Sequence, residues 1–269
     1  MRVANIVVFD SGIGGLSVYN EIYHKIPHAN FTYLFDNEGF PYGDKSNEFL
    51  VERVQKVILT ASTLFPIDLV VIACNTASTI CLPSLRERFS FPIVGVVPAI
   101  KPATLLTQNG CIGLLATKAT INRAYTHQLI NDFAKQYTVK LLGISELALM
   151  AEEKLQGDPV DVDKLTKLMQ PWLTLPVIPD TIVLGCTHYP FIKDELQSLF
   201  PNSTFVDSGY AIADRVYSLL KDQFLINEDS AYTYSIENQV CSTLYNEQVI
   251  KTLLNFEKYN LNKYQLVNI

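Results

Sequence analysis

The sequence predicts an α/β protein with two lobes, each built around a mostly parallel sheet. Short runs of Val, Ile and Leu alternate with segments of helical periodicity along most of the chain. Because these runs are continuously apolar, they are typical of strands that helices cover on both faces of a parallel sheet. A single sheet holding all of them would be large for 269 residues, so we expect two sheets.

The predicted strands and helices follow one another in a regular order. The first helix spans residues 16–26, where the apolar side chains share one helical face. Ser46 is the expected N-cap of a second, longer helix. The predicted strands cover residues 4–9, 30–35, 68–73, 91–97, 111–116, 138–143, 181–185 and 203–207.

The chain is expected to cross between the two lobes twice. Pro98 and Pro102 flank the first crossing, and the turn at residues 208–213 marks the return. We therefore assign residues 1–97 and 208–269 to the first lobe, and residues 98–207 to the second. The C-terminal part gives weaker signals. We expect it to complete the first lobe with a strand at 230–236 and a helix at 247–256.

Composition indicates a soluble, cytoplasmic protein whose main partner is not a nucleic acid. Hydrophobic residues make up 48% of the chain and charged residues 18%, with a net charge of −6. Phosphate binding needs clustered Lys and Arg, which argues against nucleic acid here. The apolar runs are too short to span a membrane, and the N-terminus has no features of a secretory signal. The five cysteines, an odd number, are expected to be free thiols.

Polar and reactive side chains gather in four loops that follow predicted strands. In open parallel sheets, functional groups lie just beyond the carboxyl ends of the strands. We therefore expect these loops to carry the chemistry of the protein. The loops are Asp10-Ser11-Gly12, Pro41-Tyr42-Gly43, Cys74-Asn75-Thr76 and Cys186-Thr187-His188.

Each of these features, taken alone, has a structural interpretation. A single cysteine at a strand end is more often a packing residue, and Asp10 could cap the helix that follows it. Two thiols in matching contexts, one of them with His188 two residues further on, favour a functional interpretation. The other cysteines lack such neighbours, so we interpret them as structural; they are Cys81, Cys111 and Cys241.

Two opposed thiols suit a reaction that inverts a stereocentre bearing a hydrogen. One group must remove the proton from one face while a second group delivers a proton to the opposite face. A thiol, with an ordinary pKa of about 8.5, can do either when its neighbours tune it. Asp10 and His188 are the candidate neighbours. Hydroxyls and N–H groups at helix starts would stabilise the carbanion through its carboxylate, and the candidates are Ser11, Asn75, Thr76 and Thr187.

Four separated motifs closely resemble those of glutamate racemases, cofactor-independent enzymes of the Asp/Glu racemase superfamily. They are VFDSGIGGLSV (8–18), FPYGDKS (40–46), ACNTAS (73–78) and GCTHYP (185–190). The resemblance runs from Val3 to about Arg215 and weakens beyond it. It implies two α/β lobes with the active site between them. It also implies the interconversion of L- and D-glutamate for peptidoglycan, with neither a cofactor nor a metal.

The resemblance further implies roles for individual residues. Cys74 would deprotonate D-glutamate and Cys186 the L-enantiomer, with Asp10 and His188 assisting them. Glu152 would be the acid of the second lobe, although Glu153 is adjacent and the stretch is degenerate. The glutamate site would be lined by Asp10, Ser11, Tyr42, Gly43, Asn75, Thr76, Thr117, Thr120, Thr187 and His188.

The resemblance also bears on partners other than the substrate glutamate. The segments KLQG (154–157) and PWL (171–173) resemble family members that respond to UDP-N-acetylmuramoyl-L-alanine. This peptidoglycan precursor is therefore a candidate activator. A homodimer is also compatible with the resemblance, because oligomeric state varies within the family.

Dinucleotide binding is the best rival interpretation from the residues themselves. Residues 12–17 nearly match the G-x-G-x-x-G fingerprint, and Asp36 could be its later acid. Ser17, however, stands where the third glycine belongs, and Asp10 would place negative charge near a pyrophosphate.

Three further alternatives use the cysteines differently. Zinc could be held by Cys74, Cys186, His188 and Asp10, although the chain has no C-x-x-C pair. A Cys–His hydrolase would leave one thiol idle, and a non-enzymatic binding protein would not explain matched thiols.

Within the racemases, aspartate or another acidic amino acid is the alternative substrate. His188 and Ser78 favour the glutamate branch.

Overall fold

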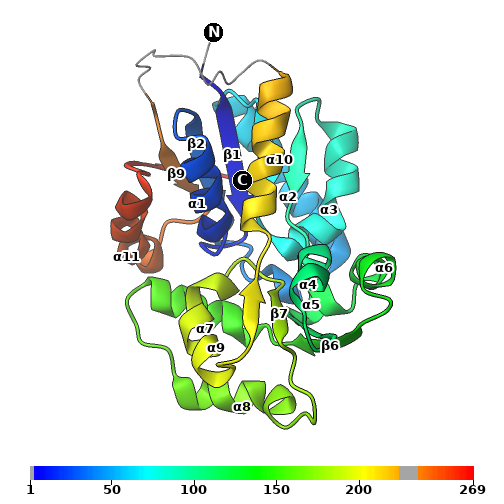
Figure 1. Cartoon of the computed structure of the whole chain (residues 1–269). Helices are drawn as coiled ribbons and strands as arrows, with labels where there is room; N and C mark the ends of the chain where they lie inside the picture. Colours follow the sequence, from blue (N-terminus) through cyan, green and yellow to red (C-terminus); the bar gives the residue numbers. More distant parts are fainter. Residues whose placement is uncertain (1–2, 224–235) are drawn as a thin grey trace. The chain divides into compact units, whose positions relative to one another are not determined.

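The structure, a computed structural model, describes residues 3–223 and 236–269 (Figure 1). The chain forms two compact units. One contains the residues up to Val96 and those from Gly209 onward, and the other is Val97–Ser208. Each unit has its own sheet, and every strand pair in the described residues is parallel. The predicted α/β class is therefore confirmed.

The first unit is built on a six-stranded sheet in the order β10-β9-β2-β1-β3-β4. In its centre, Asp10 at the end of β1 pairs with Phe35 at the end of β2, and Phe9 pairs with Ile72 of β3. The residues that follow these strands therefore share one edge of the sheet. The strands are β1 Asn5–Asp10, β2 Asn30–Phe35, β3 Leu69–Ile72, β4 Ile93–Gly95, β9 Gln239–Ser242 and β10 Lys263–Leu266.

Helices cover both faces of this sheet. On one face, α2 (Asn47–Leu64) and α3 (Asn75–Arg88) pack on Val7, Phe9, Val70 and Ile72 in one buried cluster. The helices α1 (Leu16–Lys25) and α10 (Gly209–Asp222) pack side by side (Figure 1). The remaining helices of the unit are η1 Tyr42–Asp44, α11 Glu247–Phe256 and η3 Glu257–Tyr259.

The second unit is built on a four-stranded sheet in the order β6-β5-β7-β8. Its strands are β5 Cys111–Ala116, β6 Thr138–Gly143, β7 Thr181–Leu184 and β8 Thr204–Val206. Gly185 ends β7 against β5, where its N–H donates to the Leu115 carbonyl at 2.7 Å. A Cβ on Gly185 would come within 2.9 Å of both Ala116 Cβ and Leu114 Cδ1. This close approach requires glycine immediately before Cys186.

Two apolar clusters lie on the two faces of the second sheet. One cluster joins Leu115, Ile182 and Leu184 to helices α7 (Glu146–Leu155), α8 (Val162–Leu173) and α9 (Lys193–Leu199), together with η2 (Tyr189–Ile192). The other joins Ile112, Leu114 and Val183 to α4 (Ile100–Leu106) and α6 (Ala124–Phe133). The short helix α5 (Lys118–Ile121) follows β5. No helix in the described ranges is long and apolar enough to cross a membrane.

The structure sharpens several predictions of local structure. The N-cap role of Ser46 is confirmed, because its side chain accepts a hydrogen bond from the Phe49 N–H. The first helix ends one residue early, since Ile26 leaves the helical region with φ −134° and ψ 63°. The helix at 247–256 is confirmed. The strand expected at 230–236 falls outside the described residues, apart from Ile236. The last strand, β10, is mostly exposed, so its sequence has no clear apolar pattern that would predict it.

Candidate active site

Two groups of polar side chains lie at the carboxyl ends of the two sheets, one in each unit. The Cys74 group follows the central strands of the first unit, and the Cys186 group follows those of the second. Members of the Cys74 group are Asp10, Ser11, Tyr42, Gly43, Cys74, Asn75 and Thr76. Members of the Cys186 group are Thr117, Thr120, Glu152, Cys186, Thr187 and His188.

Cys74 occupies the N-cap of α3 in extended backbone geometry, with φ −127° and ψ 116°. Its thiol is buried at the end of the helix where backbone N–H groups lack helical partners. A thiolate is favoured at such a position by the helix dipole. Asn75 and Thr76 form the first turn of this helix.

Ser11 links Cys74 to Asp10. The Ser11 Oγ lies 3.7 Å from Cys74 Sγ and 3.4 Å from Asp10 Oδ1. Asp10 is fully buried, and its carboxylate accepts hydrogen bonds from the N–H groups of Ser11 at 2.7 Å and Gly15 at 2.5 Å. Asp10 therefore organises the turn before α1, whose N-cap is Gly15, and is separated from the Cys74 thiol by the Ser11 hydroxyl.

The Asn75 carboxamide offers a binding group to a ligand. Only 4% of this residue is exposed, and its Oδ1 has no hydrogen-bond partner among the described residues. A buried acceptor without a partner is costly, and most such groups in native proteins are satisfied. The carboxamide is therefore suited to accept an N–H from a bound molecule.

Cys186, His188 and Glu152 form a connected row in the second unit. The Cys186 Sγ lies 3.8 Å from His188 Nδ1, and His188 Nε2 lies 2.6 Å from Glu152 Oε1. Of the two adjacent glutamates that the sequence left open, Glu152 is the one that contacts His188, whereas Glu153 is exposed.

The charge of His188 is set by competing effects. Burial disfavours the imidazolium, but hydrogen bonds to Cys186 and Glu152, together with the charges of both groups, raise the pKa of His188 well above its ordinary value. The imidazolium would hold a thiolate at Cys186 on one side and the Glu152 carboxylate on the other. This arrangement suits a thiol that exchanges protons.

Thr117 and Thr120 follow β5, and Thr187 follows Cys186 after β7, the strand paired with β5. Thr117 caps α5 by accepting from the Thr120 N–H at 3.2 Å, and the two hydroxyls are 3.0 Å apart. Thr117, Thr120 and Thr187 are all buried. The structure thus places each predicted residue of this unit near the end of one of two adjacent strands, or, for Glu152, on the neighbouring α7.

The remaining cysteines lie in packing environments. All five cysteines are free thiols. Cys81 and Cys241 belong to the apolar cluster beneath α2 and α3, and burial raises the pKa of Cys241 to about 12. Burial also raises the pKa of Cys111. A raised pKa suppresses the reactive thiolate, which agrees with a structural role for Cys111 and Cys241.

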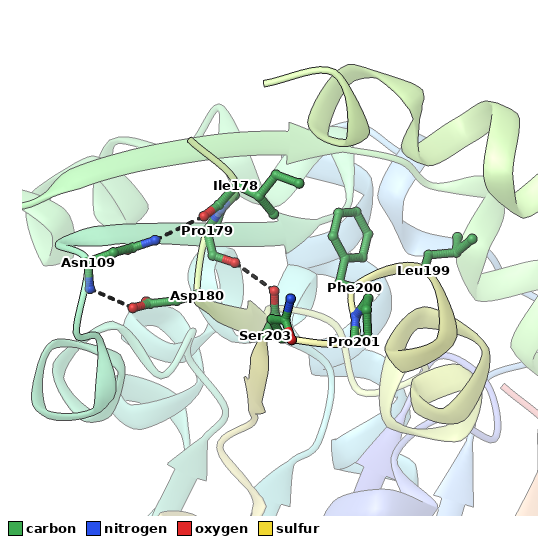
Figure 2. A pocket seen from close by; sticks show the side chains of 9 residues that line it. Asn109, Ile178, Pro179, Asp180, Leu199, Phe200, Pro201 and Ser203 are labelled. Carbon is green, nitrogen blue, oxygen red and sulfur yellow. Dashed lines mark hydrogen bonds between the residues drawn. The ribbon is translucent and has the colours of Figure 1, made fainter. Parts of the chain in front are cut away.

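The described pockets include one in each unit. One, of about 260 Å³, lies in the second unit near the start of β7, where Asn109 and Ser203 bond to the Ile178–Asp180 segment (Figure 2). Because β7 begins there and Cys186 follows its other end, this pocket is at the opposite edge of the sheet. The other, of about 580 Å³, lies in the first unit and is lined by Arg86, Phe89, Phe91 and Arg215, among others.

The structure weakens the dinucleotide interpretation. In the glycine-rich turn, the Gly15 N–H donates to Asp10, so it is already used. The Asp36 carboxylate, which would have to bind ribose, accepts hydrogen bonds from Arg53, Tyr42 and Thr243 instead. No group of three or more metal-ligating side chains is found within residues 3–223 and 236–269.

Sequence reasoning missed the partners of Asp36. Arg53 lies on α2 and Thr243 follows β9, far from any motif. Arg53 contacts Asp36 across 17 residues of sequence and Thr243 does so across 207. No spacing signal connects positions so far apart, so only the fold could reveal the cluster.

Comparisons with known proteins agree with this geometry. Residues 24–216 match the family Asp/Glu/Hydantoin racemase. Glutamate racemase from Salmonella typhimurium is 54% identical over 219 residues, which cover 81% of this chain and 77% of that protein. The Escherichia coli glutamate racemase structure, in complex with L-glutamate and the activator UDP-MurNAc-Ala, superposes with a TM-score of 0.92 at 44% identity and covers 99% of both chains. A Bacillus anthracis glutamate racemase isoform gives 0.83 at 25% identity, covering 100% of this chain and 98% of that one.

The contact between Glu152 and His188 leads to a prediction. The variant Glu152→Gln removes a carboxylate that raises the pKa of His188, so this pKa should fall. Folding raises the pKa of His188 above the value of the unfolded chain, which is about 6.5 for histidine. The protonated imidazole therefore stabilises the fold fully at pH values below about 6.5, and this stabilisation is lost as the pH rises through the pKa of the folded state. The destabilisation by Glu152→Gln should therefore be greatest at acidic pH, roughly 1–3 kcal/mol, and shrink at alkaline pH.

Imidazole NMR titration and denaturant unfolding at several pH values measure these two effects. The matched control is Glu153→Gln, which changes the exposed neighbouring residue and should leave both quantities close to those of the parent. An unchanged His188 titration in Glu152→Gln would contradict this account of the pair.

Proposed function

Because the chain belongs to the Asp/Glu/Hydantoin racemase family, we propose that it interconverts L- and D-glutamate, with Cys74 and Cys186 as the two proton carriers. As a racemase, the protein is an isomerase. The observation that carries the proposal is that each unit places a buried thiol with its own polar partner at the carboxyl edge of its sheet. The product D-glutamate is the form that such enzymes supply for peptidoglycan.

The reaction needs one thiolate and one thiol at a time. The thiolate removes the α-proton of glutamate from one face, and the electron pair of the broken C–H bond passes into the α-carboxylate. The opposite thiol then gives its proton to the other face of the same carbon, which leaves it as a thiolate. Family resemblance assigns the deprotonation of D-glutamate to Cys74 and that of L-glutamate to Cys186. The protonation states of the two thiols are interchanged after each turnover.

The partners of each thiol support this division of work. The N-terminus of α3 would stabilise the Cys74 thiolate, and the Ser11 hydroxyl, whose hydrogen is donated to Asp10, would accept a hydrogen bond from the Cys74 thiol when that thiol is protonated. In the second unit, His188 would stabilise the Cys186 thiolate while Glu152 holds the imidazole in place. Neither thiol therefore needs a cofactor for activation.

Dipoles and hydroxyls would hold the substrate. The unpartnered Asn75 oxygen suits the α-ammonium group, and the N–H groups at the start of α3 suit a carboxylate. Aspartate is the alternative substrate. Glutamate is favoured by the 54% identity to a glutamate racemase. The other proposed contacts come from Ser11, Tyr42, Gly43, Thr76, Thr117, Thr120, Thr187 and His188.

We also propose that UDP-N-acetylmuramoyl-L-alanine activates the enzyme, because the similar Escherichia coli protein binds this activator. The pocket in the first unit has suitable chemistry for part of this ligand. Arg86 and Arg215 would bind its phosphates, and Phe89 and Phe91 offer aromatic surface. Two hydrogen bonds from the Arg86 guanidinium to the Ile93 carbonyl, at 3.2 and 3.0 Å, fix its direction.

The cysteine variants test the mechanism directly. Cys74→Ala and Cys186→Ala should each lower the rate of racemisation by roughly a thousandfold or more, because each removes one proton carrier. The matched control, Cys111→Ala, removes a structural thiol and should keep turnover near that of the parent. Circular dichroism at 200–210 nm follows the optical activity of glutamate in each case. Near-normal turnover in a folded Cys74→Ala or Cys186→Ala variant would rule out the two-thiol mechanism.

Asp10 gives a second prediction. In Asp10→Asn the carboxylate that reaches Cys74 through Ser11 becomes neutral, so the proton-transfer step should slow. We expect kcat to fall by roughly a hundredfold while KM changes little. Steady-state kinetics with both enantiomers measure the two constants. An unchanged kcat would leave Asp10 with only its role in the turn before α1.

The activator proposal predicts a separable loss. Arg215→Gln should abolish the stimulation by UDP-N-acetylmuramoyl-L-alanine while the basal rate is retained. The control is Arg88→Gln, since Arg88 lies outside the pocket and donates to Gln55 on the surface. Full stimulation of the Arg215→Gln enzyme would exclude this pocket.

Light scattering of the same samples would distinguish a monomer from the homodimer that the family resemblance allows.

A further inference from the structure

The Asp36 carboxylate is the centre of a buried cluster beside the Cys74 group. It follows β2, has no exposed surface, and accepts four hydrogen bonds. Arg53 donates from Nε at 2.9 Å and from Nη2 at 2.6 Å, the Tyr42 hydroxyl donates at 2.6 Å, and the Thr243 hydroxyl donates at 2.6 Å. The mechanism proposed above uses none of these contacts.

The cluster keeps Asp36 ionised although it is buried. Burial raises the pKa of a carboxyl group, but the hydrogen bonds from Arg53, Thr243 and Tyr42 outweigh this effect and lower the pKa of Asp36 below its ordinary value. The cluster leaves no room for a side chain at the neighbouring Gly39. A Cβ on Gly39 would come within 2.5 Å of Asp36 Oδ2 and 3.0 Å of Tyr42 Cε1.

Tyr42 connects this cluster to the thiol. Its ring is buried in the same apolar cluster as Cys74, and it belongs to the Pro41-Tyr42-Gly43 turn. Burial, Asp36 and the nearby Cys74 together raise the pKa of Tyr42 well above its ordinary value, so the phenol keeps its proton. A phenol has a single hydroxyl hydrogen, and in this structure it points at Asp36.

We propose that Asp36 is a positioning residue, which fixes the Pro41-Tyr42-Gly43 turn beside Cys74 and takes up the only hydroxyl hydrogen of Tyr42. The hydrogen is thereby withheld from the thiolate, so that Cys74 remains a strong enough base to remove a proton from carbon. Asp10, acting through Ser11, is then the acidic group that governs Cys74. This inference rests on the proposed function for its catalytic consequence.

The same cluster gives the C-terminal segment a function. Thr243 lies just after β9, and its own N–H donates to the Phe35 carbonyl at 3.2 Å at the end of β2. Its hydroxyl and the Arg53 guanidinium of α2 both donate to Asp36 Oδ1, so a residue after β9 and a residue of α2 meet on one oxygen. We therefore infer that the segment after β9, through Thr243, supports the Cys74 group.

The test is Asp36→Asn, read out on the thiols as well as on activity. The amide of Asp36→Asn offers one acceptor oxygen to groups that donate four hydrogen bonds, which frees the Tyr42 hydroxyl to donate to the Cys74 thiolate, and Arg53 keeps only Glu38 as its charge partner. Both changes favour the thiolate, so alkylation of Cys74 by iodoacetamide at neutral pH should accelerate severalfold. Cys186, in the other unit, is the internal control, and peptide mass spectrometry reports both sites. The kcat/KM for glutamate should fall by roughly a hundredfold, because the base is weaker and the turn is displaced.

Three further substitutions separate positioning from stability. Glu38→Gln removes the other carboxylate that Arg53 contacts, at 2.6 Å, without touching Tyr42, and should match the parent. In a Tyr42→Phe background no hydroxyl is available, so Asp36→Asn should accelerate Cys74 alkylation much less. If Asp36→Asn does not fold, Thr243→Val, which removes one donor at the C-terminal side, should shift Cys74 in the same direction by a smaller factor.

The outcomes are distinct. Faster alkylation of Cys74 alone, dependent on the Tyr42 hydroxyl, supports the proposal. An unchanged Cys74 rate in a folded variant, or an equal change at Cys74 and Cys186, overturns it. A parent protein that does not racemise glutamate would refute the proposed function, yet the alkylation result would still decide whether Asp36 controls Cys74.

Discussion

A thiol that removes a proton from carbon must be shielded from water and must still be able to ionise. Burial works against ionisation, so every buried thiolate needs a local source of positive potential or hydrogen-bond donors. Under the proposed mechanism, the protein meets this requirement in two different ways. Cys74 lies at the N-terminus of α3 with a serine hydroxyl beside it, whereas Cys186 lies beside an imidazole that a glutamate holds in place. Most of what surrounds the two thiols can be understood as support for these two solutions.

The parallel sheets bring together the residues that surround each thiol. Because neighbouring strands run in the same direction and in register, β1, β2 and β3 deliver Asp10, Asp36 and Cys74 to one edge of the first sheet. In the second unit, β5 and β7 deliver Thr117 and Cys186 in the same way. The glycine at 185 allows β7 to approach β5 closely at the residue before the thiol. The chemistry therefore depends on strand register more than on any one loop.

Much of the fold, and many of the residues around the two thiols, could be predicted from the sequence, because local sequence patterns specify them. Continuous apolar runs specify the strands, and reactive residues directly after them specify the Cys74 group and the Cys186 group. The choice between Glu152 and Glu153 could not be made locally, since it depends on which face of α7 meets His188. Likewise, the Asp36 cluster joins residues from β2, α2 and the segment after β9. Its members are related only by the fold, so the sequence showed Asp36 merely as a possible dinucleotide ligand.

Ser78 illustrates the same limit. It was interpreted as a mark of the glutamate branch. Its hydroxyl donates to the Ile72 carbonyl at 2.9 Å and accepts from the Val96 N–H at 3.0 Å, so it joins the ends of β3 and β4. Ser78 thus holds together the sheet edge that carries Cys74.

The most direct test of the central claim uses the parent protein without added cofactor, after dialysis against a chelator. D-Glutamate is incubated with the protein in D2O, optical activity is followed by circular dichroism, and deuterium at Cα is measured by mass spectrometry. The account predicts loss of optical activity, with solvent deuterium in the L-glutamate that forms, and much slower reaction of D-aspartate. Absence of exchange with both amino acids, or racemisation without deuterium incorporation, would contradict it.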